Sequence, residues 1–279
     1  MIYLVLLSVP AAVLAWYLGS KFRDHWKQQR RRRLQAAPFP DAWRELLWQQ
    51  FALYRKLPDR ERRTLERHMQ VFMAEKVFVG CNGMEINEHV KLLIAAQACI
   101  LILNKATDYY PGFATILVYP ETFVVPMTQR DGMVHSDVVS VRTGESWHRG
   151  PVVLAWDQVL QGARNDRDGH NVVMHEFAHK LDEENWQMDG LPILSDPQQY
   201  GPWKQVLTDA YQQLHRAMEL DQPDVIDDYG ATSPAEFFAV VTETFFEKPQ
   251  QLQQQHPQLY DQFKRYYGSD PVHWVLRES

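Results

Sequence analysis

The sequence predicts an α+β domain, with a mixed sheet packed on helices, that follows a single hydrophobic helix at the N-terminus. The chain has 279 residues, of which 45% are hydrophobic, enough for one full core and an appendage. Long helix-forming stretches alternate with short β-branched runs bounded by Gly or Pro. A separate apolar run without charges, residues 2–18, precedes a cluster of basic residues.

The N-terminal run is barely long enough to span a bilayer. Its positive charges follow it instead of preceding it, which disfavours a cleaved signal peptide and keeps the basic cluster in the cytoplasm. We therefore predict a transmembrane anchor at 1–20, a basic juxtamembrane linker at 21–40 and the main domain at 41–279. The domain would lie on the cytoplasmic face of the inner membrane. A helix lying on the membrane and a soluble cytoplasmic protein are the alternatives.

Charge is unevenly distributed along the chain. Residues 19–35 carry seven Lys or Arg and one Asp, so the remainder has a net charge of −12 within a total of −6. An acidic body is a poor nucleic-acid binder, and we expect no nucleic-acid partner. The basic segment is better explained by attraction to anionic lipid. Cys81 and Cys99 form no metal-binding pattern, which is compatible with a reducing compartment.

The elements of the main domain can be placed from periodicity and from their Gly and Pro boundaries. β-branched runs predict short strands, and longer runs with caps or interrupting charges predict helices. The expected helices are 43–54, 59–76, 87–103, 203–219, 234–246 and 257–267, and the expected strands are 77–80, 114–119, 133–135 and 152–156. We expect a further helix over the segment 171–182, which carries the most informative motif.

That motif is His175-Glu176-Phe177-Ala178-His179. Histidines four residues apart lie on one face of a helix, so both imidazoles can bind the same metal ion. Glu176 follows His175 directly and can reach a water at that metal without ligating it, which is the place of a general base. Asp182 shares the helical face and is a candidate for orienting a ligand imidazole; a helix-end residue bonded to backbone is the alternative.

A hydrolytic zinc site needs a third protein ligand. The segment 227–246 predicts a second helix, with Ser233 as N-cap and Pro234 in the first turn. Its carboxylates Glu236 and Glu243 share a face. Glu236 also has the spacing of a capping box with Ser233, and Glu243 has the alternative of a buried hydrogen-bond partner for a histidine. We favour Glu236 as the ligand and Glu243 as the partner of a ligand histidine.

These residues resemble a known family. The run His-Glu-Phe-Ala-His-Lys-Leu-Asp at 175–182, followed by Tyr-x-x-x-Ser-Pro-Ala-Glu at 229–236 and the further match of Phe-Ala-Val at 238–240, resembles the Mlc titration factor A family of zinc peptidases. This family is related to the catalytic domain of anthrax lethal factor. The resemblance covers roughly residues 57–272, including runs at 119–125 and 144–156, and implies a zincin-like metallopeptidase domain of the gluzincin type.

Carried over residue by residue, the resemblance implies that His175, His179 and Glu236 bind one Zn²⁺ and that Glu176 is the base. It also places Tyr229 at the reaction centre, where its hydroxyl can support the oxyanion. The implied function is peptide hydrolysis by metal-activated water, including an aminopeptidase-like mode, on a peptide or protein substrate. The alternative is a regulatory module that retains zinc and binds a transcriptional repressor as its partner.

Overall fold

The computed structural model describes residues 2–121 and 150–275, with side chains from residue 16 onward. The chain divides into two compact units, Met1–Phe39 and Pro40–Ser279. The predicted strand at 133–135 lies outside the described residues. The two units are described separately below.

The first unit consists of one helix, α1 (Ile2–Ala36). The predicted basic linker, 21–40, is helical as far as Ala36. Lys, Arg, Gln and Leu are good helix formers, and Pro38 and Pro40 are the first residues that interrupt the run. Within the described part of the chain, no helix is long and apolar enough to cross a membrane. The predicted anchor at 1–20, most of whose side chains lie outside the description, finds no support here.

The second unit contains a small sheet with the strand order β1-β2-β3. The strands are β1 (Val77–Gly80), β2 (Thr115–Tyr119) and β3 (Val152–Ala155). Both pairings are parallel, with Val77 opposite Thr115 and Ile116 opposite Val152. The mixed sheet that we expected is thus parallel throughout the described strands. A helix follows β1 before the chain returns to β2, and such a crossover connection produces a parallel pair.

The helices of the second unit agree with the predicted ranges, with three exceptions: one helix is broken, and the helices at 156–164 and 249–255 lie outside those ranges. The predicted helix 43–54 is broken at Phe51, whose backbone is extended and whose side chain is buried. The helix after β3 was not expected, because Trp156 continues the apolar run of that strand. The helices are α2 (Asp41–Gln50), α3 (Ala52–Lys56), α4 (Asp59–Glu75), α5 (Glu88–Ile100), α6 (Trp156–Arg164), α7 (Val172–Asp182), α8 (Tyr200–Glu219), α9 (Pro234–Glu247), α10 (Pro249–Gln255) and α11 (Pro257–Tyr267).

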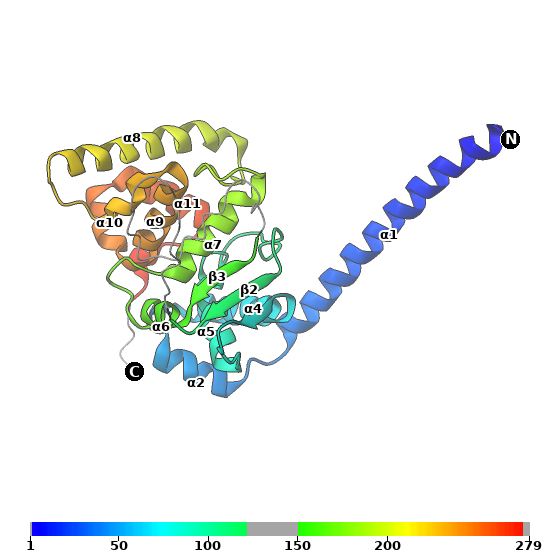
Figure 1. The fold of residues 1–279 in the computed structure, drawn as a ribbon, viewed down its shortest axis with the longest axis horizontal. Helices are drawn as coiled ribbons and strands as arrows, with labels where there is room; N and C mark the ends of the chain where they lie inside the picture. Colours follow the sequence, from blue (N-terminus) through cyan, green and yellow to red (C-terminus); the bar gives the residue numbers. More distant parts are fainter. Residues whose placement is uncertain (1, 122–149, 276–279) are drawn as a thin grey trace. The chain divides into compact units, whose positions relative to one another are not determined.

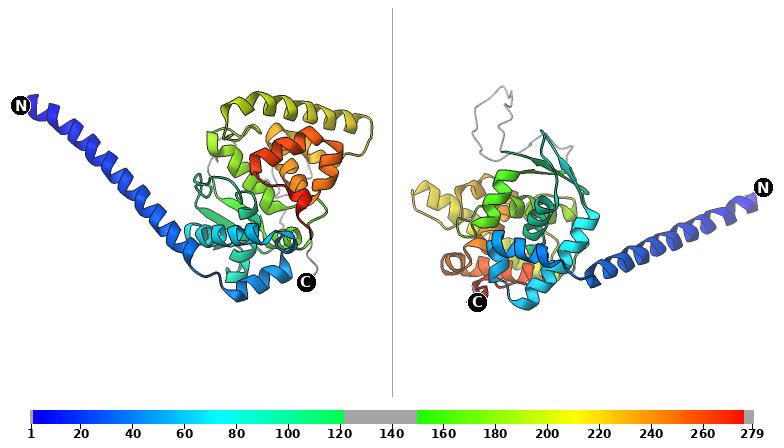
Figure 2. Two further views of the ribbon diagram at one scale, coloured as in Figure 1. Left: turned by 180° about the vertical axis from the view of Figure 1, so that it is seen from behind. Right: turned by 90° about the horizontal axis from the view of Figure 1, so that it is seen from below.

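Helix α7, which carries the histidine motif, lies between β3 and α9 (Figure 1). Its apolar face packs through Phe177, whose ring centroid is 4.9 Å from that of Tyr110 and 5.6 Å from that of Phe72. Helix α9 is buried along nearly its whole length, with α8, α10 and α11 gathered around it (Figure 2). Burial of both helices fixes the faces that they turn toward each other.

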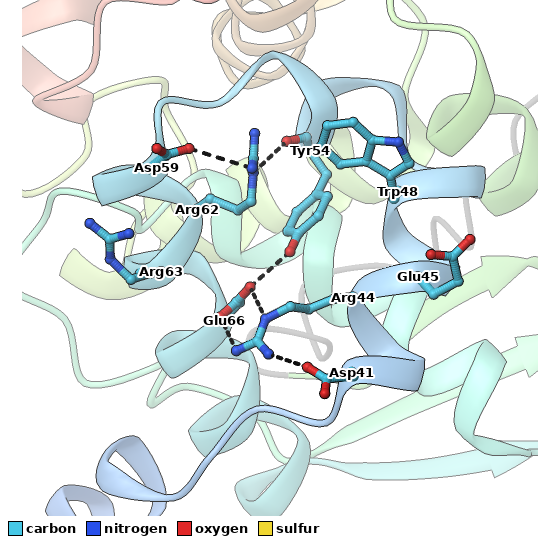
Figure 3. A pocket seen from close by; sticks show the side chains of 9 residues that line it. All are labelled: Asp41, Arg44, Glu45, Trp48, Tyr54, Asp59, Arg62, Arg63 and Glu66. Carbon is cyan, nitrogen blue, oxygen red and sulfur yellow. Dashed lines mark hydrogen bonds and ion pairs between the residues drawn. The ribbon is translucent and has the colours of Figure 1, made fainter. Parts of the chain in front are cut away.

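A cavity of about 480 Å³ lies among α2, α3 and α4 (Figure 3), and no residue of the histidine motif lines it. Its polar floor is the α2–α4 ion-pair network, defined here as Arg44, Glu66 and Tyr54. The guanidinium of Arg44 donates to both carboxylate oxygens of Glu66 at 3.0 and 3.1 Å, and the Tyr54 hydroxyl donates to the same carboxylate at 2.8 Å. Glu66 is thereby neutralised within the protein, and this network ties α2 to α4.

Candidate metal centre

Helix α7 begins at a buried asparagine. Asn171 is the N-cap, and its side-chain oxygen accepts the N–H of Met174 at 3.0 Å. From this start, His175 and His179 fall on one face, and Phe177 falls on the opposite face against the aromatic core. The Nε2 atoms of the two histidines approach to 3.2 Å, so both rings point at the same place.

Helix α9 begins at Ser233, which caps the helix by accepting the N–H of Glu236 at 3.2 Å. Pro234 occupies the first turn, as predicted. The Glu236 carboxylate faces α7, with Oε2 at 3.0 Å from Nε2 of His175 and 3.4 Å from Nε2 of His179. The backbone of Glu236 therefore takes part in the cap while its side chain faces the histidines.

We define the metal cluster as His175, His179 and Glu236, a set whose geometry is suited to holding a metal ion. The three distances between its facing atoms are 3.0, 3.2 and 3.4 Å. Ligands at about 2.0–2.1 Å from a tetrahedral ion lie about 3.3 Å from one another. The donor atoms thus already have the spacing of three corners of a tetrahedron, and two imidazoles with a carboxylate are an established ligand set.

Glu243 lies two helical turns after Glu236 and reaches the outer side of the His175 ring. Its Oε1 accepts from Nδ1 of His175 at 2.7 Å, and its Oε2 accepts the backbone N–H of Asn171 at 2.5 Å. A carboxylate on Nδ1 fixes the tautomer that leaves Nε2 as the acceptor. Glu236 thus lies on the Nε2 side of the His175 ring and Glu243 on its Nδ1 side, which is the arrangement that we favoured from the sequence.

Glu176 and Tyr229 lie beside the metal cluster. Burial raises the pKa of Glu176 above its usual value, and both histidines and Glu236 are among the charges that act on its carboxylate. Tyr229 belongs to a short turn before α9, and its ring centroid lies 6.0 Å from that of His175. The half-buried Tyr229 therefore borders the same space as the ligand atoms.

Asp182 does not bond to either histidine in the described part of the chain. Its Oδ2 accepts the N–H of Gly190 at 2.8 Å and so ties down the loop that follows α7. Burial raises its pKa to about 6. Its Oδ1 and Nδ1 of His179 are both buried without a hydrogen-bond partner in the described part of the chain. These two atoms belong to residues three apart on one helix, where side chains are neighbours.

The charges of the cluster act strongly on one another. Burial lowers the pKa of His175, but the carboxylates of Glu243 and Glu236 outweigh this and raise it well above its usual value. Burial raises the pKa of Glu236, but hydrogen bonds from both histidines hold it well below its usual value. The carboxylates of Glu236 and Glu243 therefore stabilise a positive charge at the metal cluster, which either a proton on an imidazole or a metal ion can supply.

Two supporting residues were not identified from the sequence. Asn171 and Glu247 are joined by a hydrogen bond of 3.1 Å between Nδ2 and Oε1, and both are buried. Asn171 carries the signal of an N-cap before an apolar run, which sequence inspection can detect. Glu247, at the end of an apolar helix, carries no pattern that distinguishes it from a solvated helix-end carboxylate.

The chain was compared with known proteins. The model of the family described as glucose-regulated metallo-peptidase M90 matches residues 25–268. The chain belongs to this family. Because the family is one of metallopeptidases, the M90 match makes the protein a metal-dependent peptide hydrolase, and every residue of the metal cluster lies within the matched range.

Relatives of the M90 chain cover most of its length. An uncharacterized protein of Synechocystis sp. is 42% identical over 270 residues, which span 96% of this chain and 97% of the relative. Mlc titration factor A of Cronobacter sakazakii is 34% identical over 228 residues, spanning 77% and 82%. Mlc titration factor A of Escherichia coli O7:K1 is 33% identical over 252 residues, spanning 88% and 91%. The resemblance inferred from the sequence motifs is confirmed.

Proposed function

We propose that the protein is a zinc-dependent metallopeptidase whose His175, His179 and Glu236 hold the metal. The observation that carries the proposal is the convergence of these three donor atoms at 3.0–3.4 Å, with the half-buried Glu176 next to His175 on the same helix. Bound zinc lowers the pKa of a water molecule and polarises the scissile carbonyl. Two imidazoles and one carboxylate are the ligand set of several hydrolytic zinc enzymes.

The remaining roles belong to side chains around the cluster. Glu176 accepts the proton of the attacking water and delivers it to the leaving amine, and its raised pKa suits an acid–base group that works near neutral pH. The Tyr229 hydroxyl donates to the oxygen that gains negative charge. Glu243 holds His175 in the required tautomer, and we assign the same role toward Nδ1 of His179 to Asp182, whose Oδ1 and that nitrogen are both buried without a partner among the described residues.

The test separates metal binding from catalysis. The full chain is expected to contain one zinc ion and to cleave small peptide or amide substrates. Glu176→Gln keeps the shape of the side chain but removes the base, so activity should fall by about 10²–10⁴-fold while the zinc content is unchanged. Metal analysis and a peptide-cleavage assay on the same preparations make the comparison. Full activity in Glu176→Gln would overturn the mechanism.

A second function is supported by the name shared by two relatives, Mlc titration factor A. In this alternative, the zinc domain binds a transcriptional repressor. The complete donor set and Glu176 with its raised pKa favour the peptidase, because binding alone requires neither. The two functions separate if a repressor co-purifies equally with the wild-type chain and with Glu176→Gln. Loss of peptide cleavage without loss of such a partner would show that both functions operate.

The cellular location also remains a proposal. The apolar run 2–18 and the basic residues after it support attachment to the cytoplasmic face of the inner membrane, and a soluble cytoplasmic form is the alternative. Fractionation of cells that express the full chain and a variant lacking residues 2–18 distinguishes the two. Attachment predicts that only the full chain sediments with membranes and resists extraction by high salt.

A further inference from the structure

Every polar group of Asn171 is used, although the residue lies outside the metal cluster. Its carbonyl accepts the N–H of His175 at 2.9 Å, and its side-chain oxygen accepts the N–H of Met174. Its backbone N–H donates to Glu243, and its side-chain nitrogen donates to Glu247 at 3.1 Å and to the carbonyl of Gly162 at 3.2 Å. Asn171 is 1% exposed and thus joins three helices, α6, α7 and α9.

Glu247 is the counterpart of Asn171 on α9. Its Oε1 accepts from the Asn171 side chain, and its Oε2 accepts the N–H of Gly169 at 3.0 Å. Glu243 and Glu247 lie one turn apart on α9, so their carboxylates accept hydrogen bonds from two backbone N–H groups of the segment just before α7. The same helix carries Glu236 at its other end. The contacts of Asn171 therefore fix the position of α7 along α9.

The fit around Asn171 leaves no room for adjustment. A Cβ atom on Gly162 would lie 2.9 Å from both Cγ and Nδ2 of Asn171. Such a distance is shorter than real side-chain contacts, so α6 can approach only because residue 162 is glycine. Close packing on one side and two carboxylates on the other hold the Asn171 amide in one orientation.

We propose that Asn171 and Glu247 are positioning residues that set the register between the two ligand-bearing helices and thereby the metal affinity. The inference rests on the proposed metal site. A chain of two hydrogen bonds runs from Asn171 through Glu243 to Nδ1 of His175. The imidazoles belong to α7 and Glu236 belongs to α9, so a shift of α7 along α9 would separate the ligands. Ordinary capping would stabilise α7 without affecting the metal.

Asn87 is a matched control for the capping role. It is the N-cap of α5, and its side-chain oxygen accepts the N–H of Val90 at 3.0 Å. Serine retains N-cap capacity at both positions. At position 171, however, serine removes the donor to Glu247 and Gly162, whereas Asn87 is exposed and has no role at the metal cluster. Glu247→Gln supplies a second variant, since it replaces one of the two acceptor oxygens, Oε1 facing Asn171 or Oε2 facing Gly169, with an NH₂ donor.

The experiment measures the zinc affinity of the full chain by chelator competition and the visible absorption of its Co²⁺ form. Asn171→Ser and Glu247→Gln should each weaken zinc binding by about 10–100-fold. Both should alter the Co²⁺ spectrum, whereas Asn87→Ser should match the wild type in both readouts. If Asn171→Ser does not fold, Glu247→Gln decides alone.

Three contrary results have separate meanings. Wild-type affinity and an unchanged Co²⁺ spectrum in the folded position-171 and position-247 variants would overturn the positioning role and leave the proposed function intact. Failure of the wild-type chain to bind zinc or Co²⁺ would overturn the proposed metal site itself. A spectral change equal in Asn87→Ser and Asn171→Ser would also reject the inference, because it would trace the effect to helix capping in general.

Discussion

The α2–α4 ion-pair network and the metal cluster are both formed by polar side chains in the interior, but their charges are balanced differently. Glu66 faces the guanidinium of Arg44, which is always protonated, so this network is neutral at any physiological pH. Glu236 and Glu243 face the imidazoles of His175 and His179. An imidazole is positive only when protonated, so the metal cluster takes its balancing charge from solution.

The carboxylate of the α2–α4 network is paired with a permanent cation of the protein, whereas those of the metal cluster are not. The α2–α4 network lines a cavity of about 480 Å³, yet its carboxylate is already satisfied. The metal cluster has three donor atoms that face one another, and this arrangement stabilises a cation bound between them. Convergent donors whose charge is not balanced within the protein, more than the volume of a cavity, therefore support the metal cluster as the proposed site of chemistry.

The largest expected effect would break the metal cluster. Glu236→Ala removes a predicted ligand and should abolish stoichiometric zinc binding, whereas Glu243→Ala removes only the hydrogen bond to His175 and should weaken binding by about 10–100-fold. Metal content after dialysis and chelator competition measure both. If Glu243→Ala releases zinc and Glu236→Ala retains it, the two assignments must be exchanged.

A smaller effect is expected in the α2–α4 network. Glu66→Ala leaves the buried Tyr54 hydroxyl and part of the Arg44 guanidinium without their acceptor, which should lower the free energy of unfolding by about 3 kcal/mol. Urea denaturation measures the loss, and Glu66→Gln is the shape-conserving control with a smaller effect. The zinc content of the folded variant should equal that of the wild type. A loss of zinc would show that the two clusters are coupled.

The smallest expected effect concerns Asp182 and has the opposite sign. Its pKa rises from 3.8 to about 6 on folding, so the folded state binds this proton more tightly than the unfolded state. Stability should therefore fall as the pH rises from about 4 to about 6. In the metal-free chain at pH 7, Asp182→Asn should raise the free energy of unfolding by about 2 kcal/mol.

The same substitution tests the link between Asp182 and His179. The variant should also lose the decline in stability between pH 4 and 6, which urea titrations at several pH values can follow. If Asp182 orients His179 when metal is bound, Asp182→Asn weakens zinc binding while it stabilises the metal-free protein. Unchanged stability at every pH would contradict the effect of burial on this carboxylate.

The sequence predicted the elements of the site well because each has a local signature. The spacing of His175 and His179 and the cap at Ser233 determine which faces α7 and α9 present, and both follow from helix geometry. The choice between Glu236 and Glu243 as the residue facing both histidines was harder, since both share one face. Only the position of α9 against α7 places Glu236 at 3.0 Å from Nε2 and Glu243 at 2.7 Å from Nδ1 of the same ring.

Other features could not be predicted because they depend on long-range packing. The parallel direction of the strands follows from how the connections cross the sheet, which periodicity does not report. Helix α6 was missed because the buried end of β3 and the start of α6 form one apolar run at residues 152–156. Asn171 and Glu247 are 76 residues apart, and nothing local to either residue indicates the bond between them.

The origin of the metal cluster in two distant helices has a consequence for protein synthesis. His175 and His179 leave the ribosome well before Glu236, and α9 packs against α10 and α11, which are synthesised after it. The three donors therefore meet only after α9 and the helices that pack against it are available to fold. A partly synthesised chain that ends before α9 has the HExxH sequence but lacks Glu236, so the metal cluster cannot form on it.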